Sequence, residues 1–232
     1  METVEFSRLH LQDKAKVLDL GAGGGRHALR ASEVGYMSFA LDRCSDGLVS
    51  MNNWIEHAGV GSSIEVYSVV GDANELPFPD AIFDAVVCSE VLEHVVEPIG
   101  IVSEIYRVLK LGGTVAITVP RTYPEVVCWL ISKEYHSAKG GHIRIFRRGT
   151  LVDLCESVGL RYCSFSYTHA LHTPYWWLKC VVGVNKSGNR IVDLYEKLLI
   201  KQMSDREGLL NRLDRSLGRL FGKSMVVYAK KR

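Results

Sequence analysis

A run of glycines follows the first short apolar segment of the chain, and a carboxylate stands just before it. Residues 17–25 read VLDLGAGGG, so Asp19 lies two positions ahead of Gly21. Glycines allow the backbone to pass close to a ligand, and a helix that begins here presents free N–H groups and a positive dipole end. The carboxylate of Asp19 would repel a pyrophosphate. It suits a ligand that is cationic near this loop, such as an ammonium or a sulfonium.

Further acids follow the next two apolar segments. Asp42 ends the second, where a carboxylate can accept hydrogen bonds from both hydroxyls of a ribose. Asp72, in the turn after the third, is placed to accept a hydrogen bond from the exocyclic amine of a base, and a turn or helix-capping role is an equal alternative. Asp84 opens the fourth segment, away from the other acids, and we expect it to be structural.

These acids can form one site only if the elements bring the ends of the apolar segments together. From residue 16, short segments typical of buried strands alternate with segments of helical spacing. This alternation predicts a parallel sheet covered on both faces, whose ligands bind at the carboxyl ends of the strands. We predict strands at 16–20, 37–42, 64–70, 83–88, 114–119, 161–168 and 223–230. We predict helices at 26–34, 47–57, 99–109, 123–134, 150–158, 191–200 and 209–220.

Two stretches are harder to interpret. Gly112 and Gly113 are predicted to close the helix at 99–109, since glycine is common where helices end. Residues 169–184 contain a Pro-Tyr-Trp-Trp sequence and fit no single period.

The chemistry-bearing residues together resemble a known family. Asp19 with its glycines, Asp42, Asp72 and the run at 88–94 (CSEVLEH) occur in order at successive strand ends, as in the class I S-adenosylmethionine-dependent methyltransferases. The runs at 76–84 (LPFPDAIFD) and 91–94 (VLEH) resemble the small-molecule branch, methyltransferase type 11, which includes quinone-biosynthesis enzymes. The resemblance is good over residues 15–120 and moderate over 140–168.

The resemblance implies S-adenosylmethionine as cofactor and an α/β fold. This fold is a Rossmann-like doubly wound sheet of seven strands, mostly parallel with the last, at 225–229, antiparallel. Helices cover both faces, and a helical insertion precedes the last strand. The glycines would line the methionine part of the cofactor, and the acids would bind its ammonium, ribose and adenine. The implied cofactor-binding residues are Asp19, Gly21, Ala22, Gly23, Asp42, Arg43, Asp72, Ala73, Ser89 and Glu90.

The implied reaction is methyl transfer to a small-molecule acceptor, with O-methylation favoured over C- or N-methylation. The methyl donor is already activated, so the protein mainly aligns donor and acceptor. A hydroxyl acceptor would benefit from a general base, a role that suits histidine. His142 lies in a run, GGHIRIF, that commonly covers the acceptor site in the family, and its alternative is to fix this lid to the core. His94 follows the fourth strand and has a capping or packing alternative. His169 and His172 are weaker candidates.

The aromatic stretch has several interpretations. Tyr175, Trp176 and Trp177 could line a pocket for an apolar or aromatic acceptor. Alternatively, the tryptophans could contact a membrane surface together with the basic tail, since residues 186–232 carry a formal charge of +7. A third interpretation is an insertion whose aromatics pack on the sheet. His169 and His172 lack a third ligand, so no metal site is predicted.

Bulk properties set the remaining expectations. A length of 232 residues favours one domain, with a lid or acceptor insertion at 121–149 and an aromatic, helical insertion at 169–222. The net charge of +2 gives no reason to expect a nucleic acid partner. The N-terminus does not resemble a signal peptide, there is no apolar run of membrane-spanning length, and the cysteines form no CxxC pair. A cytoplasmic location is therefore expected. If the tryptophans and the basic tail contact a membrane surface, the protein would be peripheral at that membrane.

Two other functions deserve comparison. A nicotinamide-dependent oxidoreductase would need a glycine at position 26, the sixth place of the GxGxxG fingerprint, and Arg26 stands there instead. A non-catalytic Rossmann-fold binding module would not need the complete set of acids at the strand ends. Both alternatives are therefore disfavoured.

Overall fold

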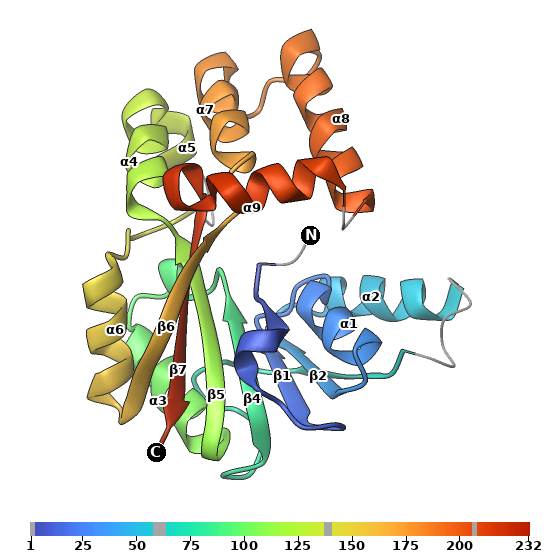
Figure 1. Ribbon diagram of the computed structural model, residues 1–232, viewed down its shortest axis with the longest axis vertical. Helices are drawn as coiled ribbons and strands as arrows, with labels where there is room; N and C mark the ends of the chain where they lie inside the picture. Colours follow the sequence, from blue (N-terminus) through green and yellow to red (C-terminus); the bar gives the residue numbers. More distant parts are fainter. Residues whose placement is uncertain (1–2, 58–63, 137–140, 206–207) are drawn as a thin grey trace.

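The sheet has the seven strands, mostly parallel with the last antiparallel, that the resemblance implies. The computed structural model describes residues 3–57, 64–136, 141–205 and 208–232. A seven-stranded sheet runs in the order β3-β2-β1-β4-β5-β7-β6 (Figure 1). Strand β7 is antiparallel to both of its neighbours, and the pairs among β1 to β5 are parallel. The predicted fold class is confirmed.

The strands lie close to their predicted positions, because each is a short apolar run bounded by turn residues. Their bounds are Lys16–Leu20 (β1), Met37–Asp42 (β2), Val66–Val70 (β3), Phe83–Ser89 (β4), Leu109–Pro120 (β5), Leu160–Thr168 (β6) and Ser224–Lys231 (β7).

The helices fill the connections between the strands. They are α1 (Arg26–Glu33), α2 (Ser45–His57), α3 (Pro98–Val108), α4 (Thr122–Ile131), α5 (Lys133–His136), α6 (Arg148–Ser157), α7 (His172–Val182), α8 (Arg190–Ser204) and α9 (Leu209–Phe221). Two single-turn 3₁₀ helices, η1 (Phe6–Leu9) and η2 (Leu92–His94), complete the order.

Both faces of the sheet are buried, as a doubly wound fold requires. On β4, Val86 belongs to a core cluster that includes side chains of α3 and α6. Its neighbours Ala85 and Val87 belong to a second cluster, with η1 and α1, on the opposite face. Because successive side chains of a strand point to opposite faces, one uninterrupted apolar run serves both cores. This arrangement fixes the positions of the strand ends.

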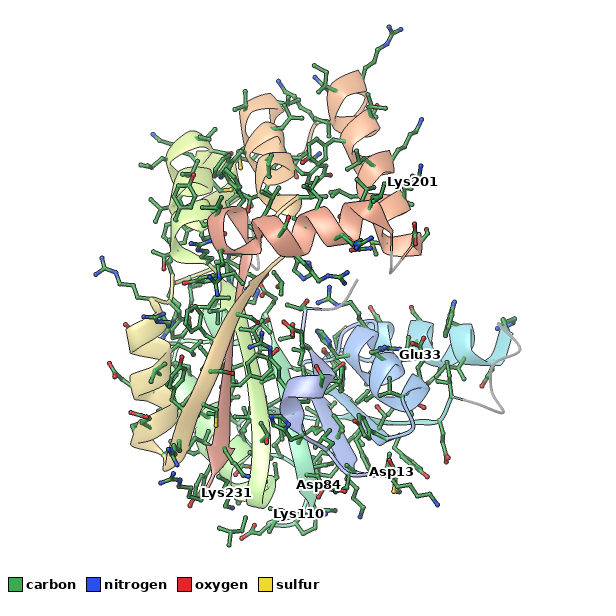
Figure 2. All side chains as sticks on the ribbon, viewed as in Figure 1. Asp13, Glu33, Asp84, Lys110, Lys201 and Lys231 are labelled. Atoms are coloured by element: carbon green, nitrogen blue, oxygen red, sulfur yellow. The ribbon has the colours of Figure 1, made fainter. Side chains whose placement is uncertain are left out.

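The remaining helices form a cap beyond one edge of the sheet (Figure 1). Helices α4 and α5 follow β5, and α7, α8 and α9 lie between β6 and β7. The opposite edge carries Asp84, which pairs with Lys110 at 2.7 Å and accepts a hydrogen bond from the backbone N–H of Lys16 (Figure 2). Asp84 thus lies away from the cap, where the sequence predicts a structural acid. Among the described residues, no helix has the length and apolar character of a membrane span.

Some element bounds differ from those predicted. The glycine pair does not end the helix, because α3 stops at Val108 and β5 begins at once. Gly112 and Gly113 lie instead where the pairing register of β5 with β4 shifts. The helix predicted at 123–134 is two helices, separated by Ser132 in an extended conformation. Residues 64 and 65 lie outside β3, and the aromatic stretch contains α7. Residues 137–140 of the insertion predicted at 121–149 fall outside the described residues.

Candidate active site

The first half of the glycine turn is held close to the sheet. The N–H groups of Gly21 and Ala22 both donate to the carbonyl of Leu41, at 2.8 and 3.0 Å, so β1 and β2 end side by side. Gly21 has a φ of +72°, which glycine adopts without strain. A Cβ atom there would collide with the side chain of Val91, so the position has no room for a larger residue.

The second half of the turn is open on one side. A Cβ atom at Gly23 or Gly24 would meet nothing within 4 Å, whereas one at Gly25 would collide with Met51 of α2. Gly25 is the residue before α1, with a φ of +72°. The exposed backbone of this turn, just before the start of a helix, is therefore accessible to a ligand.

Asp42 lies beside this opening, at the end of β2. One carboxylate oxygen accepts from the N–H of Gly23 and the other from the N–H of Cys44, each at 2.8 Å. A carboxylate oxygen has two lone pairs, so both oxygens can still accept another donor. The side chain is thus fixed in orientation and able to receive a pair of hydroxyls.

Asp72 and its neighbours follow β3 at the same edge. The backbone N–H and side-chain amide of Asn74 both donate to one oxygen of Asp72, at 2.8 and 2.9 Å. These hydrogen bonds, with a smaller effect from the charge of Arg43, lower the pKa of Asp72. Asp72 is therefore ionised and close to Arg43, while Ala73 packs against the core.

Asp19 is more enclosed than the other acids. It is 2% exposed, and its carboxylate accepts from the N–H of Ala28 in the first turn of α1, at 3.0 Å. Burial raises the pKa of Asp19 to about 7. The side chain therefore joins the end of β1 to the start of α1, behind the open part of the turn. Its contact with an ammonium stays a prediction.

Ser89 and Glu90 occupy the end of β4. The Ser89 hydroxyl lies 2.9 Å from that of Thr118, which in turn donates to the Glu90 carboxylate at 2.9 Å. Glu90 has a φ of +54°, a left-handed conformation that is uncommon for a residue other than glycine. Such strain is found more often at ligand sites than elsewhere. Here it turns the Glu90 side chain toward the space beneath the cap.

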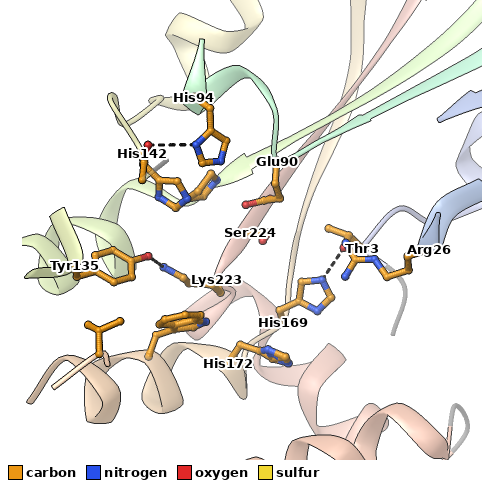
Figure 3. A pocket seen from close by; sticks show the side chains of 14 residues that line it. Thr3, Arg26, Glu90, His94, Tyr135, His142, His169, His172, Lys223 and Ser224 are labelled. Atoms are coloured by element: carbon orange, nitrogen blue, oxygen red, sulfur yellow. Dashed lines mark hydrogen bonds between the residues drawn. The ribbon is translucent and has the colours of Figure 1, made fainter. Parts of the chain in front are cut away.

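That space is a cavity of about 370 Å³ between the sheet edge and the cap (Figure 3). It brings together Glu90, both predicted catalytic histidines and residues from the far end of the chain. Residues that line it include Glu90, His94, His142, His169, Trp176 and Lys223.

His142 is held by a buried carboxylate. Its Nδ1 atom lies 2.5 Å from an oxygen of Glu125, on α4, whose side chain is fully buried. The other oxygen of Glu125 accepts from Lys223 at 2.6 Å, and the carboxylate also accepts from the Tyr135 hydroxyl at 3.2 Å and the Trp129 indole at 3.1 Å. One acid therefore connects α4, α5, the His142 loop and the residue before β7.

The charge of Glu125 fixes the tautomer of His142. Burial on its own would raise the pKa of Glu125, but the hydrogen bond from His142 and the charge of Lys223 outweigh it and lower the pKa to about 2. An ionised carboxylate can only accept, so the Nδ1 of His142 must be the donor. The Nε2 atom of the neutral ring then carries the lone pair, as a general base requires.

A second buried acid faces the other side of the same ring. Glu93, in η2, is fully buried, and neither of its carboxylate oxygens has a hydrogen-bond partner among the described residues. Burial, together with the charge of Glu90, raises the pKa of Glu93, which favours its protonated form. One of its oxygens lies 4.0 Å from Nε2 of His142. The ligand atoms of Glu93, His94 and His142 lie within 4.8 Å of one another and could hold a metal ion. The absence of a metal stays a prediction.

His94 is exposed and holds the loop in place. Its Nδ1 atom lies 3.2 Å from the carbonyl of Gly141, which can only accept, so the ring donates. Its ring centre is 5.1 Å from that of His142. His94 is therefore near the cavity, with one nitrogen committed to positioning the segment that carries His142.

The two tryptophans have different surroundings. Trp176 lines the cavity with its ring 5.6 Å from that of Tyr135. Trp177 donates to the carbonyl of Pro124 at 3.3 Å and contacts Tyr123, so it packs α7 against α4. His169 is buried and also lines the cavity, with its Nε2 atom 2.8 Å from the hydroxyl of Thr3. All three contribute to the cavity or to the packing of the cap.

Comparison with known proteins identifies the architecture. Residues 18–117 match the sequence profile of a family described as "Methyltransferase domain". Over these residues, a little under half of its length, the chain is similar to S-adenosylmethionine-dependent methyltransferases of class I. A protein of Bacillus halodurans assigned as a methyltransferase has the same fold, with a TM-score of 0.65 and 22% identity over 97% of this chain and 96% of that one.

Curated relatives match the methyltransferase domain more closely in sequence. A ubiquinone biosynthesis O-methyltransferase of Xanthomonas campestris is 33% identical over 122 residues, which are 52% of this chain and 50% of that protein. A sterol 24-C-methyltransferase of Gibberella zeae is 31% identical over 139 residues, 60% of this chain and 34% of that protein. The match thus spans about half or less of these relatives.

The site fits the cofactor of this class. The open backbone at Gly23 and Gly24 leaves room for a ligand, and the spare lone pairs of Asp42 suit the hydroxyls of a ribose. The acids at the ends of β2, β3 and β4 favour a ligand that carries positive charge. S-adenosylmethionine has both features, whereas a dinucleotide would bring a pyrophosphate to the same edge.

Proposed function

We propose that this methyltransferase domain transfers a methyl group from S-adenosylmethionine to a hydroxyl of a small apolar or aromatic acceptor. The acceptor would occupy the cavity beneath the cap, beside Trp176 and Tyr135. The relative named for ubiquinone biosynthesis, an O-methyltransferase, supports this acceptor class. The cofactor would be held by the ten residues at the ends of β1 to β4 that the resemblance implies.

When bound, S-adenosylmethionine supplies a methyl group that its sulfonium already activates. The chain would orient the acceptor in the cavity and remove its proton. Nε2 of His142 accepts the hydroxyl proton as the oxygen gains the methyl group, and Glu125 stabilises the resulting imidazolium. His94 acts by holding the loop at Gly141. Glu93, which has an oxygen 4.0 Å from the same Nε2 atom, is protonated and therefore does not compete for the proton.

The buried Glu125–His142 pair is the observation that carries the choice of oxygen as the methylated atom. The match to a sterol 24-C-methyltransferase supports carbon as the alternative. A hydroxyl must lose a proton during methyl transfer, and a base fixed by an ionised acid suits that step. The pair thus favours O-methylation over C-methylation.

The test uses S-adenosylmethionine with a ¹³C-labelled methyl group and a set of phenols and catechols with apolar substituents. We expect S-adenosylhomocysteine to form only with an acceptor, and the label to appear as a methyl ether by NMR. The His142→Ala variant should lose at least 100-fold in turnover, within the usual contribution of a general base, and keep its affinity for S-adenosylhomocysteine. Equal turnover in variant and parent would remove His142 from the mechanism, and a C-methyl product would overturn O-methylation.

A further inference from the structure

The outer face of α9 combines an apolar stripe with a row of cations. Leu209, Leu213 and Leu220 are spaced by four and seven residues, so they lie on one side of the helix, and Leu209 and Leu220 are 81% and 64% exposed. Arg212, Arg215 and Arg219 form an adjacent exposed stripe. The acid of this helix, Asp214, is buried on the opposite side.

Helix α8 repeats this arrangement. Ile191, Leu194 and Leu198 form its apolar stripe, in which Leu194 is 70% exposed. The helical positions of Arg190, Lys197 and Lys201 place these exposed cations next to the apolar stripe. Asp193 and Glu196 lie on the other side of the cations. Apolar and cationic residues are thus neighbours on both helices. On α8, Asp193 lies one helical turn from both Arg190 and Lys197.

The six cations of these two faces are Arg190, Lys197 and Lys201 on α8 and Arg212, Arg215 and Arg219 on α9. Among the described residues, no ion pair includes any of them. A second copy of the chain would bring like charges together if it packed on the same faces. An apolar stripe beside exposed cations instead matches the boundary of an anionic lipid layer, where leucines enter the acyl region and cations contact headgroups.

We propose that the outer faces of α8 and α9 bind the surface of a membrane that contains anionic lipids. In this proposal, these faces make the contact in place of the tryptophans of α7, which have this role in one interpretation of the sequence. Trp176 faces the cavity and Trp177 faces α4. The lipid-binding face lies at the cap end of the molecule, where Figure 2 labels Lys201, far from Lys110 and Lys231 at the opposite edge.

The attachment of α9 relates this face to the cavity. Two hydrogen bonds join α9 to the start of α7. The carboxylate of Asp214 accepts from the N–H of Leu171 at 2.9 Å, and the carbonyl of Phe221 accepts from the hydroxyl of Thr173 at 2.5 Å. Helix α7 in turn carries Trp176 into the cavity wall. A lipid-bound cap would therefore hold the acceptor cavity close to the membrane, although the binding itself does not depend on the identity of the acceptor.

The experiment measures co-sedimentation of the full chain with two kinds of vesicle, phosphatidylcholine alone and phosphatidylcholine with phosphatidylglycerol. We expect binding to the mixed vesicles, weakened by salt, and at least tenfold weaker binding to the neutral ones. The triple variant Arg212→Gln, Arg215→Gln, Arg219→Gln should bind the mixed vesicles more than tenfold more weakly, since each cation near an anionic surface contributes roughly fivefold. The double variant Leu213→Gln, Leu220→Gln should dissociate from the mixed vesicles at high salt, because it lacks the apolar contact that salt does not weaken.

A matched control removes three exposed cations from the opposite edge: Lys14→Gln, Arg161→Gln, Lys230→Gln. This variant should bind as the parent does. Affinity for S-adenosylhomocysteine, measured on every variant, shows that each is folded and separates a failure of lipid binding from a failure of the proposed enzyme activity. No binding to mixed vesicles, equal binding to both kinds, or equal loss in the control would overturn the proposal. So would a leucine-dependent dimer, seen by light scattering, that does not bind vesicles.

Discussion

At the scale of single residues, Glu125 is the most connected side chain of the candidate active site. Its ionised carboxylate accepts from His142, Lys223, Tyr135 and Trp129, and all of these contacts lie in the interior. A buried pair of this kind is a weak source of net stability, but removing one partner leaves an uncompensated charge. Glu125 therefore has two separable effects, on folding and on the orientation of His142.

We expect Glu125→Gln to lower the free energy of unfolding by about 3 kcal/mol, because the charge of Lys223 is then left without its partner. Urea unfolding measures this loss. The double variant Glu125→Gln, Lys223→Met removes both charges and should recover most of the stability, yet still lose turnover, because His142 remains without an ionised acceptor. Equal stability of the single variant and the parent would contradict a buried, ionised Glu125.

Asp19 gives a pH dependence of stability. Burial raises the pKa of Asp19 to about 7 in the folded chain, so the native state keeps a proton that the unfolded chain releases near pH 4. Stability contributed by this group therefore falls as the pH rises from about 4 to about 7 and is level above that range. Asparagine does not titrate.

The difference in unfolding free energy between Asp19→Asn and the parent should thus move in favour of the variant, by about 2 to 3 kcal/mol, between pH 5 and pH 8. Urea unfolding without cofactor at the two pH values measures it. If the difference in unfolding free energy between variant and parent is the same at both pH values, Asp19 is already ionised in the folded chain at pH 5.

At the scale of elements, the glycine turn contains one position that is open to a ligand, Gly23, and one that is packed against the fold, Gly25. An added methyl group at Gly23 would enter open space, whereas one at Gly25 would collide with Met51. Both positions have positive φ, which costs an alanine about 1 kcal/mol. A comparison of cofactor affinity in the Gly23→Ala and Gly25→Ala variants therefore tests whether a ligand occupies the open side of the turn.

Gly23→Ala should remain folded, with a loss of about 1 kcal/mol in unfolding free energy, and should bind S-adenosylhomocysteine at least tenfold more weakly, because its methyl group occupies space open to the ligand. Gly25→Ala should be the less stable of the two, because Met51 must move. Calorimetry and thermal unfolding give both quantities. Normal affinity in a folded Gly23→Ala variant would show that the cofactor does not approach this turn.

The elements themselves were largely predictable from the sequence. Buried strands are short apolar runs, so their centres and the acids at their ends, such as Asp42 and Asp72, follow from local pattern. The errors arise where tertiary contacts decide. Gly112 and Gly113 look like a helix stop, but β5 needs their freedom where its register with β4 shifts. Helix α7 escaped prediction because its aromatic residues pack against several neighbours and show no simple period.

The acid and cation that surround His142 were not predicted. Glu125 and Lys223 are 98 residues apart, and only the cap brings them into contact. Lys223 precedes β7 and resembles an ordinary basic residue of the tail. Glu125 does carry a signal, because it is the acid of the otherwise apolar helix at Thr122–Ile131, and an isolated charge in such a setting is usually paired. Its partner cannot be read from sequence spacing.

At the scale of the whole molecule, the cofactor site and the cavity share one edge of the sheet. Glu90 belongs to both, because it follows β4 at the cofactor edge and also lines the cavity beneath the cap. A ligand that bridges several strand ends should stabilise the folded chain as a unit, since the unfolded chain offers no such site. Ligand-dependent stability can therefore identify the class of nucleotide without any knowledge of the acceptor.

At a concentration 100 times its dissociation constant, S-adenosylhomocysteine should raise the free energy of unfolding by about 2.7 kcal/mol. For a chain of this size, that corresponds to an increase in Tm of about 5 to 10 °C. NAD at the same concentration should leave the Tm unchanged, because its pyrophosphate would meet the acids of the strand ends. Asp42→Ala should reduce the shift produced by S-adenosylhomocysteine, since the ribose hydroxyls lose their acceptor. A larger shift with NAD would mean that the edge binds a phosphate-bearing nucleotide, and the electrostatic basis for a cationic methyl donor would be wrong.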